Sequence, residues 1–178
     1  MMKRARFFHA SLCSAIVFAL GAAAQAESAG PACSGAAGAY RDFDFLLGEW
    51  DYFSADGEPA GQTVYSRQAE GCLILEQWTG PDGDTGAGMI FLDPQTGLWR
   101  HVWMSARFHM DMSGKKDGNG AMVLEGYIHS NARGDRQAIR GLWRRDGDGP
   151  VRHAYERRDA ETGDWRPFFA GESRPRGR

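Results

Sequence analysis

The chain has 178 residues, with 21 Lys and Arg against 23 Asp and Glu, and a formal net charge of −2. The first 26 residues carry three of the basic residues and no acidic ones, so the remainder holds 18 basic against 23 acidic residues, a net charge of −5. This balance argues against nucleic acid or an anionic membrane surface as a partner.

The N-terminal segment has the pattern of a signal peptide over residues 1–26. Three basic residues lie within the first six positions, residues 11–23 are apolar, and the Ala-Gln-Ala at 24–26 fits a small-x-small cleavage site. A membrane anchor is the weaker interpretation, because a transmembrane helix needs about 20 apolar residues. We therefore expect an exported protein, periplasmic or secreted, with no membrane-spanning segment after cleavage.

Two cysteines, Cys33 and Cys72, remain after such processing. In an oxidising compartment a lone pair is most simply a disulfide, with two free thiols as the alternative. The bond would close a loop of about 38 residues and contribute on the order of 3–4 kcal/mol in the chain-entropy model. It would also tie the linker that precedes the domain to the domain itself.

The rest of the chain divides into a linker and one domain. Residues 27–39 are rich in Ala, Gly and Ser, which is typical of a linker, and residues 40–178 form the predicted domain. Residues 40–47 are aromatic and apolar but too few for a long helix, so one or two helical turns are expected there.

From Gly48 onward, turn signals such as Asp56-Gly57 and Asp82-Gly83 recur at regular intervals. Asp-Gly pairs supply the positive φ that tight hairpin turns need. Between the turn signals lie segments of strand length, many of which alternate apolar and polar residues. The ten predicted strands are 48–54, 61–70, 72–80, 86–93, 98–105, 107–114, 120–130, 135–145, 150–158 and 164–172.

Ten strands joined by short sequential hairpins favour an all-β fold with up-and-down antiparallel topology. Closing such a sheet into a single barrel removes its edge strands. A Greek-key sandwich is the alternative, but no long crossover loop supports it. A barrel of ten strands also leaves more interior room than one of eight, which is just wide enough for side chains or one small ligand.

All six tryptophans fall inside predicted strands. One interpretation makes them an aromatic core, and the other makes them walls of an aromatic-lined cavity with a few polar groups. Trp99 and Trp103 share a strand face with His101, which would place that imidazole among them. Both interpretations remain open at the level of sequence.

Glu76 lies between Ile74 and Trp78 on one face of its predicted strand. If those two residues face inward, Glu76 is a buried carboxylate and needs a cation or hydrogen-bond donors, which Arg140 or His101 could supply. The opposite interpretation has Leu73 and Leu75 inside and Glu76 in solvent.

His153 alternates with Val151 and Tyr155 and is therefore predicted to face inward. A lone inward histidine is usually a hydrogen-bonded core residue, but it could also be an axial haem ligand. No pair of histidines or carboxylates has the spacing of a metal site, and no nucleophile elbow, phosphate loop or Cys-x-x-Cys is present. No metal and no cofactor is therefore expected, with haem as the exception.

The opening of the domain resembles a large family of exported bacterial proteins of unknown function, whose mature domain opens with Phe-Asp-Phe-Trp-Leu-Gly-x-Trp-Asp. Residues 43–51 carry this motif with Leu46 in place of its Trp, and further matches follow at 71–78, 88–103 and 159–165. The cysteine pair also looks like the family's, whereas the family's closing motif is degraded over 168–174.

The resemblance implies a calycin-like barrel akin to lipocalins. Gly48 and Trp50 are similar to the lipocalin Gly-x-Trp, whose indole closes the barrel floor beneath an arginine of the last strand. Arg174 would be that arginine, through a cation–π contact. The family has no established reaction, so the resemblance suggests ligand binding by fold analogy alone.

These observations favour an exported barrel that binds a small apolar or amphipathic molecule. Alternatives are a haem-binding barrel like nitrobindin, with His153 as the ligand, an enzyme with Glu76 and His101 as acid and base, and a non-catalytic structural or interaction domain. Seven residues are predicted to bind the ligand. The apolar walls would be Trp78, Trp103, Trp143 and Tyr155. The polar anchors would be Glu76, His101 and His153.

Overall fold

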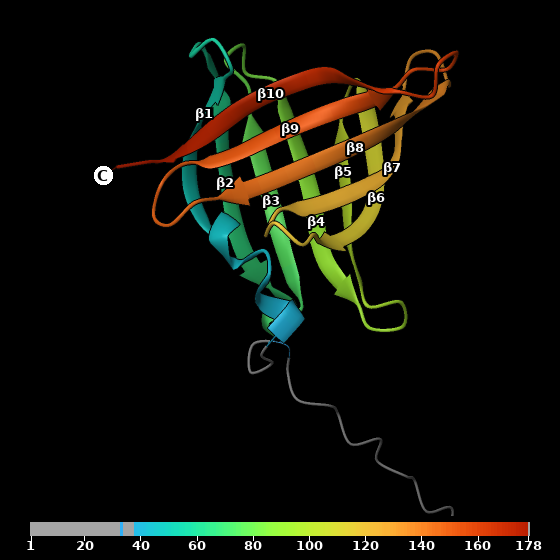
Figure 1. Cartoon of the computed structure of the whole chain (residues 1–178). Coiled ribbons are helices and arrows are strands. Elements are labelled where there is room, and N and C mark those ends of the chain that lie inside the picture. Colours follow the sequence, from blue (N-terminus) through green and yellow to red (C-terminus); the bar gives the residue numbers. More distant parts are fainter. Residues whose placement is uncertain (1–32, 34–37, 178) are drawn as a thin grey trace, which may run out of the picture.

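The structure is a computed structural model that describes Cys33 and residues 38–177. These residues form a closed antiparallel barrel in which each strand pairs with its neighbours in chain order (Figure 1). The predicted all-β up-and-down barrel is therefore confirmed. The signal peptide at 1–26 lies outside the described residues, as does the linker at 27–39 apart from Cys33, Gly38 and Ala39.

The strands lie within a few residues of their predicted positions, and short 3-10 turns precede β1 and separate β2 from β3. The elements are η2 (Gly38–Arg41), η3 (Asp44–Leu46), β1 (Gly48–Ser54), β2 (Pro59–Gln68), η4 (Ala69–Gly71), β3 (Leu73–Thr79), β4 (Thr85–Asp93), β5 (Leu98–Ser105), β6 (Phe108–Lys116), β7 (Met122–Ser130), β8 (Arg136–Arg145), β9 (Val151–Arg158) and β10 (Trp165–Pro175).

The barrel closes between its first and last strands. β1 pairs with β10 in a register that sets Trp50 opposite Pro175 and Ser54 opposite Gly171. β10 thus runs three residues beyond its predicted end at 172 and pairs with both β9 and β1. Closure leaves no strand edge free for pairing with another chain.

The N-terminal segment seals one end of the barrel, at the bottom in Figure 1. Phe43 is completely buried, and its ring meets Trp99 and Trp143 edge to face at centroid distances of 5.0 and 5.8 Å. The indole N–H of Trp50 donates to the carbonyl of Leu46 at 2.6 Å. The stretch from Phe43 to Trp50 is therefore a structural plug.

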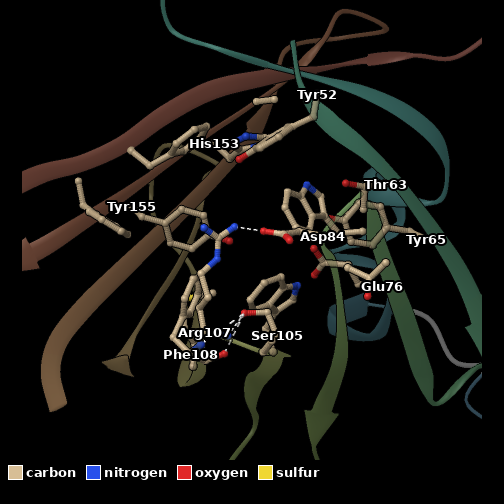
Figure 2. Close-up of a pocket in the computed structure, with 18 of the residues that line it drawn as sticks. Tyr52, Thr63, Tyr65, Glu76, Asp84, Ser105, Arg107, Phe108, His153 and Tyr155 are labelled. Carbon is tan, nitrogen blue, oxygen red and sulfur yellow. Dashed lines mark hydrogen bonds and ion pairs between the residues drawn. The ribbon is translucent and has the colours of Figure 1, made fainter. Parts of the chain in front are cut away.

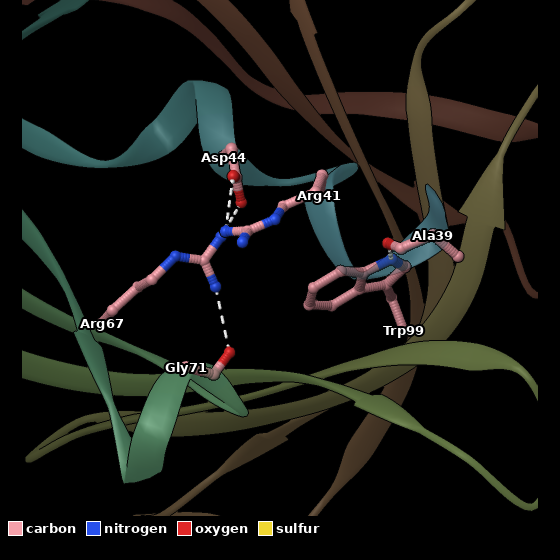
Figure 3. Close-up of polar contacts among 6 residues, drawn as sticks. All are labelled: Ala39, Arg41, Asp44, Arg67, Gly71 and Trp99. Atoms are coloured by element: carbon pink, nitrogen blue, oxygen red, sulfur yellow. Dashed lines mark hydrogen bonds and ion pairs between the residues drawn. The ribbon is translucent and has the colours of Figure 1, made fainter. Parts of the chain in front are cut away.

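Polar contacts hold this plug against the turn between β2 and β3 (Figure 3). Arg67 pairs with Asp44 and donates to the carbonyl of Gly71 at 3.0 Å. The indole N–H of Trp99 donates to the carbonyl of Ala39 at 3.1 Å. Cys33 and Cys72 form the predicted disulfide, which adds a covalent link at the same place.

The predicted contact between Arg174 and Trp50 is wrong. The guanidinium over the Trp50 ring, at 5.3 Å, belongs to Arg145 at the end of β8. Arg174 instead lies over Phe53 at 4.3 Å and pairs with Glu172. The reason is the period of the strand: Ser173 is buried inside the barrel, so its neighbour Arg174 points outward.

Among the described residues, no helix combines the length and the apolar character needed to cross a membrane.

Candidate functional site

A cavity of about 810 Å³ occupies the barrel interior above the plug. Its mouth is formed by the β3–β4 turn with Asp84 and the β5–β6 turn with Arg107, at the end opposite η3. Figure 2 shows Tyr52, Tyr65, Glu76 and Tyr155 converging on this space from different strands. The volume is within the range of small-molecule pockets, about 300–1,000 Å³.

Aromatic rings are the main apolar groups that line the cavity. The four predicted wall residues all line it, and five aromatic residues that the sequence analysis did not single out join them. The aromatic lining consists of Tyr52, Tyr65, Trp78, Trp103, Phe108, Trp143, Tyr155, Phe168 and Phe169.

Interior glycines let the large rings lie flat against the wall. A Cβ added at Gly86 would lie 2.2 Å from Cζ2 of Trp103, and one at Gly141 would lie 2.4 Å from Cη2 of Trp143. The indole of Trp103 therefore occupies space that a side chain on the neighbouring β4 would otherwise fill, and the indole of Trp143 lies over a glycine of its own strand, β8. This arrangement keeps the rings near the barrel wall and the centre open.

Glu76 faces inward, as one of the two interpretations predicted, and its partner is His101. Oε2 of Glu76 lies 2.9 Å from Nε2 of His101, and the two residues are 7% and 1% exposed. Nδ1 of His101 is buried without a hydrogen-bond partner among the described residues. The tautomer protonated on Nε2 fits this geometry, because it donates to Glu76 and leaves only a lone pair unsatisfied.

Arg140, the other predicted partner of Glu76, lies on the outer face of the barrel. It donates to Glu156 at 2.5 Å and its guanidinium lies over Trp165. His101 lies behind Glu76 and does not itself line the cavity, so Glu76 is the group of this pair that a ligand can reach.

Three tyrosines surround Glu76 and supply neutral hydroxyl groups. Burial raises the pKa values of Tyr52, Tyr65 and Tyr155 well above 10, and the negative charge of Glu76 raises them further. A hydrogen bond from Tyr65 to Glu76 acts in the same direction on Tyr65. These hydroxyl groups stay protonated at neutral pH, so those of Tyr52 and Tyr155 can donate to a ligand while that of Tyr65 donates to Glu76.

His153 lines the cavity from β9, as predicted. Its ring lies 4.1 Å from the ring of Tyr52 and 5.7 Å from that of Phe169, between centroids. Burial lowers the pKa of His153 to about 3, so the imidazole is neutral. The predicted anchor is thus an uncharged polar group within an aromatic cluster.

The surroundings of His153 do not fit an axial haem ligand. Its Nε2 is buried, exposes less than 1 Å² of surface and has no hydrogen-bond partner in the part of the chain that the structure describes. An iron atom would have to approach this nitrogen to about 2 Å with a flat macrocycle around it, which protein atoms now prevent. Across the described residues, no three His, Cys, Asp or Glu side chains are grouped as a metal site requires.

The charged groups at the mouth come from two turns. Arg107 and Asp84 form an ion pair across it, drawn as a dashed line in Figure 2. Ser105 caps the β5–β6 turn by accepting from the backbone N–H of Arg107 at 3.2 Å. The cavity therefore has a buried carboxylate at depth and an ion pair at its opening.

The sequence contained signals for some of the residues that were missed. Tyr52 follows Trp50 by two positions on β1, and Tyr65 follows Thr63 by two on β2, so each shares the inward face of its strand. The inward position of Phe169 was harder to predict from the sequence, because a bulge between Pro167 and Phe169 shifts the register of β10.

Chemically, the site combines a cavity lined by aromatic rings, one carboxylate that accepts from an imidazole, and neutral hydroxyl donors. Such a set can enclose an apolar body and orient it through a few hydrogen bonds.

No protein-family model matches the sequence, and no curated protein matches it significantly.

Proposed function

We propose that this protein binds a small apolar or amphipathic molecule inside its barrel. The observation that carries the proposal is the cavity of about 810 Å³, walled by aromatic rings and opening at one end. Burial of an apolar ligand surface there would be favourable by roughly 25 cal/mol per Å².

The polar groups support a ligand with few hydrogen-bonding positions. Glu76 is an accessible acceptor at depth, and the hydroxyl groups of Tyr52 and Tyr155 are donors nearby. A strongly hydrated molecule would lose more hydrogen bonds to water than these few groups can replace. An aromatic or aliphatic body with one or two polar substituents fits better.

A neutral fluorescent probe tests the proposal. N-phenyl-1-naphthylamine emits weakly in water and brightly in apolar surroundings, so titration should give saturable emission with one site per chain. Ala60→Trp places an indole at the cavity lining, and we expect it to abolish this signal.

Ala87→Trp is the matched control, because Ala87 is exposed on the outer face of β4. This variant should bind the probe as the unchanged protein does. A wild-type protein without saturable emission, or equal binding by both variants, would contradict binding inside the barrel.

We also propose that the chain is exported and cleaved after Ala26. The N-terminal pattern motivates this, and the Cys33–Cys72 disulfide supports it, because such bonds persist in oxidising compartments. Mass spectrometry of the protein expressed with its own N-terminus should find Glu27 first. A chain that keeps residues 1–26 would refute the cleavage.

A further inference from the structure

A second, smaller hollow of about 210 Å³ adjoins the mouth of the main cavity. It shares Arg107 and Phe108 with the main cavity and extends between the ends of β7 and β9 and the start of β8. Ile128 and Phe108 form an apolar part of its lining, with Ser130 and Gln137 as neutral polar groups. A ligand in the barrel that reached the mouth would meet this hollow.

The charge of this hollow is strongly positive. Four arginines line it, which we call the mouth arginines: Arg107, Arg133, Arg136 and Arg157. Asp135 is the one carboxylate among the lining residues, and it accepts from Nε of Arg133 at 3.0 Å. The positive cluster is unexpected on a chain whose formal net charge is −2.

Two of the mouth arginines have no carboxylate partner among the described residues. The guanidinium of Arg136 lies over Tyr127 at 4.4 Å, and that of Arg157 lies over Phe168 at 3.4 Å. Nε of Arg157 is also buried and finds no hydrogen-bond partner within Cys33 and residues 38–177. Burial lowers the pKa of Arg157, and the nearby positive charge of Arg133 lowers it further.

The position of Arg157 connects the two hollows. On β9, Val151 and His153 are buried inside the barrel, and Tyr155 and Arg157 continue the same alternation toward the mouth. Phe168, beneath the guanidinium of Arg157, lines the main cavity. The unpaired charge therefore lies at the end of the row of side chains that forms the cavity wall.

We propose that the mouth arginines bind the anionic group of the ligand whose apolar body occupies the main cavity. The ligand class is then an amphipathic organic anion that carries a carboxylate, sulfonate or phosphate monoester. Guanidinium groups recognise such oxyanions through paired N–H donors. This inference rests on the proposed function and adds the chemical class and orientation of the ligand.

The charge at the other end of the cavity agrees with this orientation. Glu76 lies deep in the barrel, where its carboxylate would repel the anionic end of a ligand. An anion at the mouth meets guanidinium donors and remains partly hydrated. The apolar end thus points toward the plug and the anionic end toward solvent.

Two probes that share an aromatic body test the inference. 1-Anilinonaphthalene-8-sulfonate carries a sulfonate, and N-phenyl-1-naphthylamine is neutral. In the double variant Arg136→Gln/Arg157→Gln we expect affinity for the sulfonate to fall about tenfold or more, the loss of one to two charge-assisted contacts. Affinity for the neutral probe should change less than about twofold.

Matched variants separate charge from structure. Arg152→Gln removes an arginine from the outer face of the same strand, where its side chain is 71% exposed, and should leave both affinities unchanged. Adding Arg157→Lys in place of Arg157→Gln restores the charge and should recover part of the sulfonate affinity. Raising the salt concentration should weaken the sulfonate and not the neutral probe.

The outcomes distinguish this inference from the proposed function. If the double variant loses affinity for both probes equally, or for neither, the arginines do not recognise the anion and the inference fails while ligand binding stands. If the unchanged protein binds neither probe, the proposed function fails, and the inference fails with it. The urea midpoint of each variant shows whether it remains folded.

Discussion

The carboxylate of Glu76 and the imidazole of His101 meet at 2.9 Å inside the barrel, from β3 and β5. The two strands are separated by β4, whose residue facing the pair is Gly88. A larger residue there would lie between the two side chains. The contact thus depends on three strands, and it places one of the few polar groups of the cavity in a fixed orientation.

Removing the imidazole should strongly destabilise the protein. His101→Phe keeps a ring of similar size but leaves Glu76 without its partner in a site that is nearly closed to water. We expect the free energy of unfolding to fall by about 3–5 kcal/mol. Urea denaturation followed by tryptophan fluorescence measures the change.

The neighbouring pair of Arg100 and Asp111 is the control for this prediction. Arg100 lies next to His101 on β5, and both partners are roughly half exposed at a nitrogen–oxygen distance of 2.6 Å. Arg100→Gln should cost less than about 1 kcal/mol, because exposed ion pairs contribute little. Equal losses in the two variants would show that the buried pair has no special role in stability.

The fold was predictable because its signals are local. Asp-Gly pairs such as Asp56-Gly57 and Asp82-Gly83 lie in turns, with Gly57 and Gly83 at φ values of 87° and 83°. Alternation then predicted that His153 faces inward, whereas it left two opposite interpretations for Glu76, because both faces of that strand carry large apolar residues.

The cavity and the arginine contacts were not predictable in this way, because they join residues from distant strands. The packing of the Trp103 indole over Gly86 joins β5 to β4 and therefore depends on the register between these strands. The position of Arg145 over Trp50 likewise joins the end of β8 to β1, two strands far apart in the sequence. The mouth arginines gather from two turns and two strands and share no sequence motif.

His153 should make stability depend on pH in mildly acidic solution. Its pKa is about 3 in the folded protein because of burial, against an ordinary value of 6.5. Above pH 6.5 neither state binds the proton, and below it the unfolded state does so first. Stability is therefore lost as the pH falls from about 6.5 toward 3, by about 2 kcal/mol between pH 7 and pH 5.

His153→Phe isolates this contribution, because a phenyl ring fits among Tyr52 and Phe169 and does not titrate. The difference in unfolding free energy between the variant and the unchanged protein should shift by about 2 kcal/mol in favour of the variant from pH 7 to pH 5. Parallel pH dependence of the two proteins would mean that His153 is protonated in the folded state or does not titrate differently on unfolding.

Arg145 should matter more to stability than Arg174. Arg145 covers Trp50, and its Nε donates to the carbonyl of Gly149 at 2.9 Å, which holds the β8–β9 turn. Arg174 is about half exposed and pairs with Glu172 at the surface. We expect Arg145→Ala to cost about 1–2 kcal/mol more than Arg174→Ala, as measured by urea denaturation. The reverse order would contradict a role of Arg145 in supporting Trp50 and the β8–β9 turn.

Loss of the disulfide should weaken the protein without unfolding the barrel. The Cys33–Cys72 bond spans a sequence separation of 39 residues, and its removal in Cys33→Ser/Cys72→Ser should cost about 3–4 kcal/mol. The far-UV circular dichroism spectrum should persist, because Phe43 and the Arg67–Asp44 pair still hold the plug. A variant as stable as the unchanged protein would contradict a stabilising role of the disulfide. A variant without β structure would show that the plug contacts do not maintain the fold by themselves.

A side chain at Gly88 should disturb both stability and binding. A Cβ there would lie 2.8 Å from Cδ1 of Trp103 and 3.0 Å from both Oε2 of Glu76 and Nε2 of His101. Gly88→Ala should therefore cost about 1–3 kcal/mol and weaken binding of N-phenyl-1-naphthylamine, because the indole must move into the cavity. Gly118→Ala is the matched control, since no atom lies within 4 Å of its Cβ, and it should stay within about 0.5 kcal/mol of the unchanged protein. If the two variants unfold and bind the probe alike, the close approach of Trp103 to β4 does not shape the cavity.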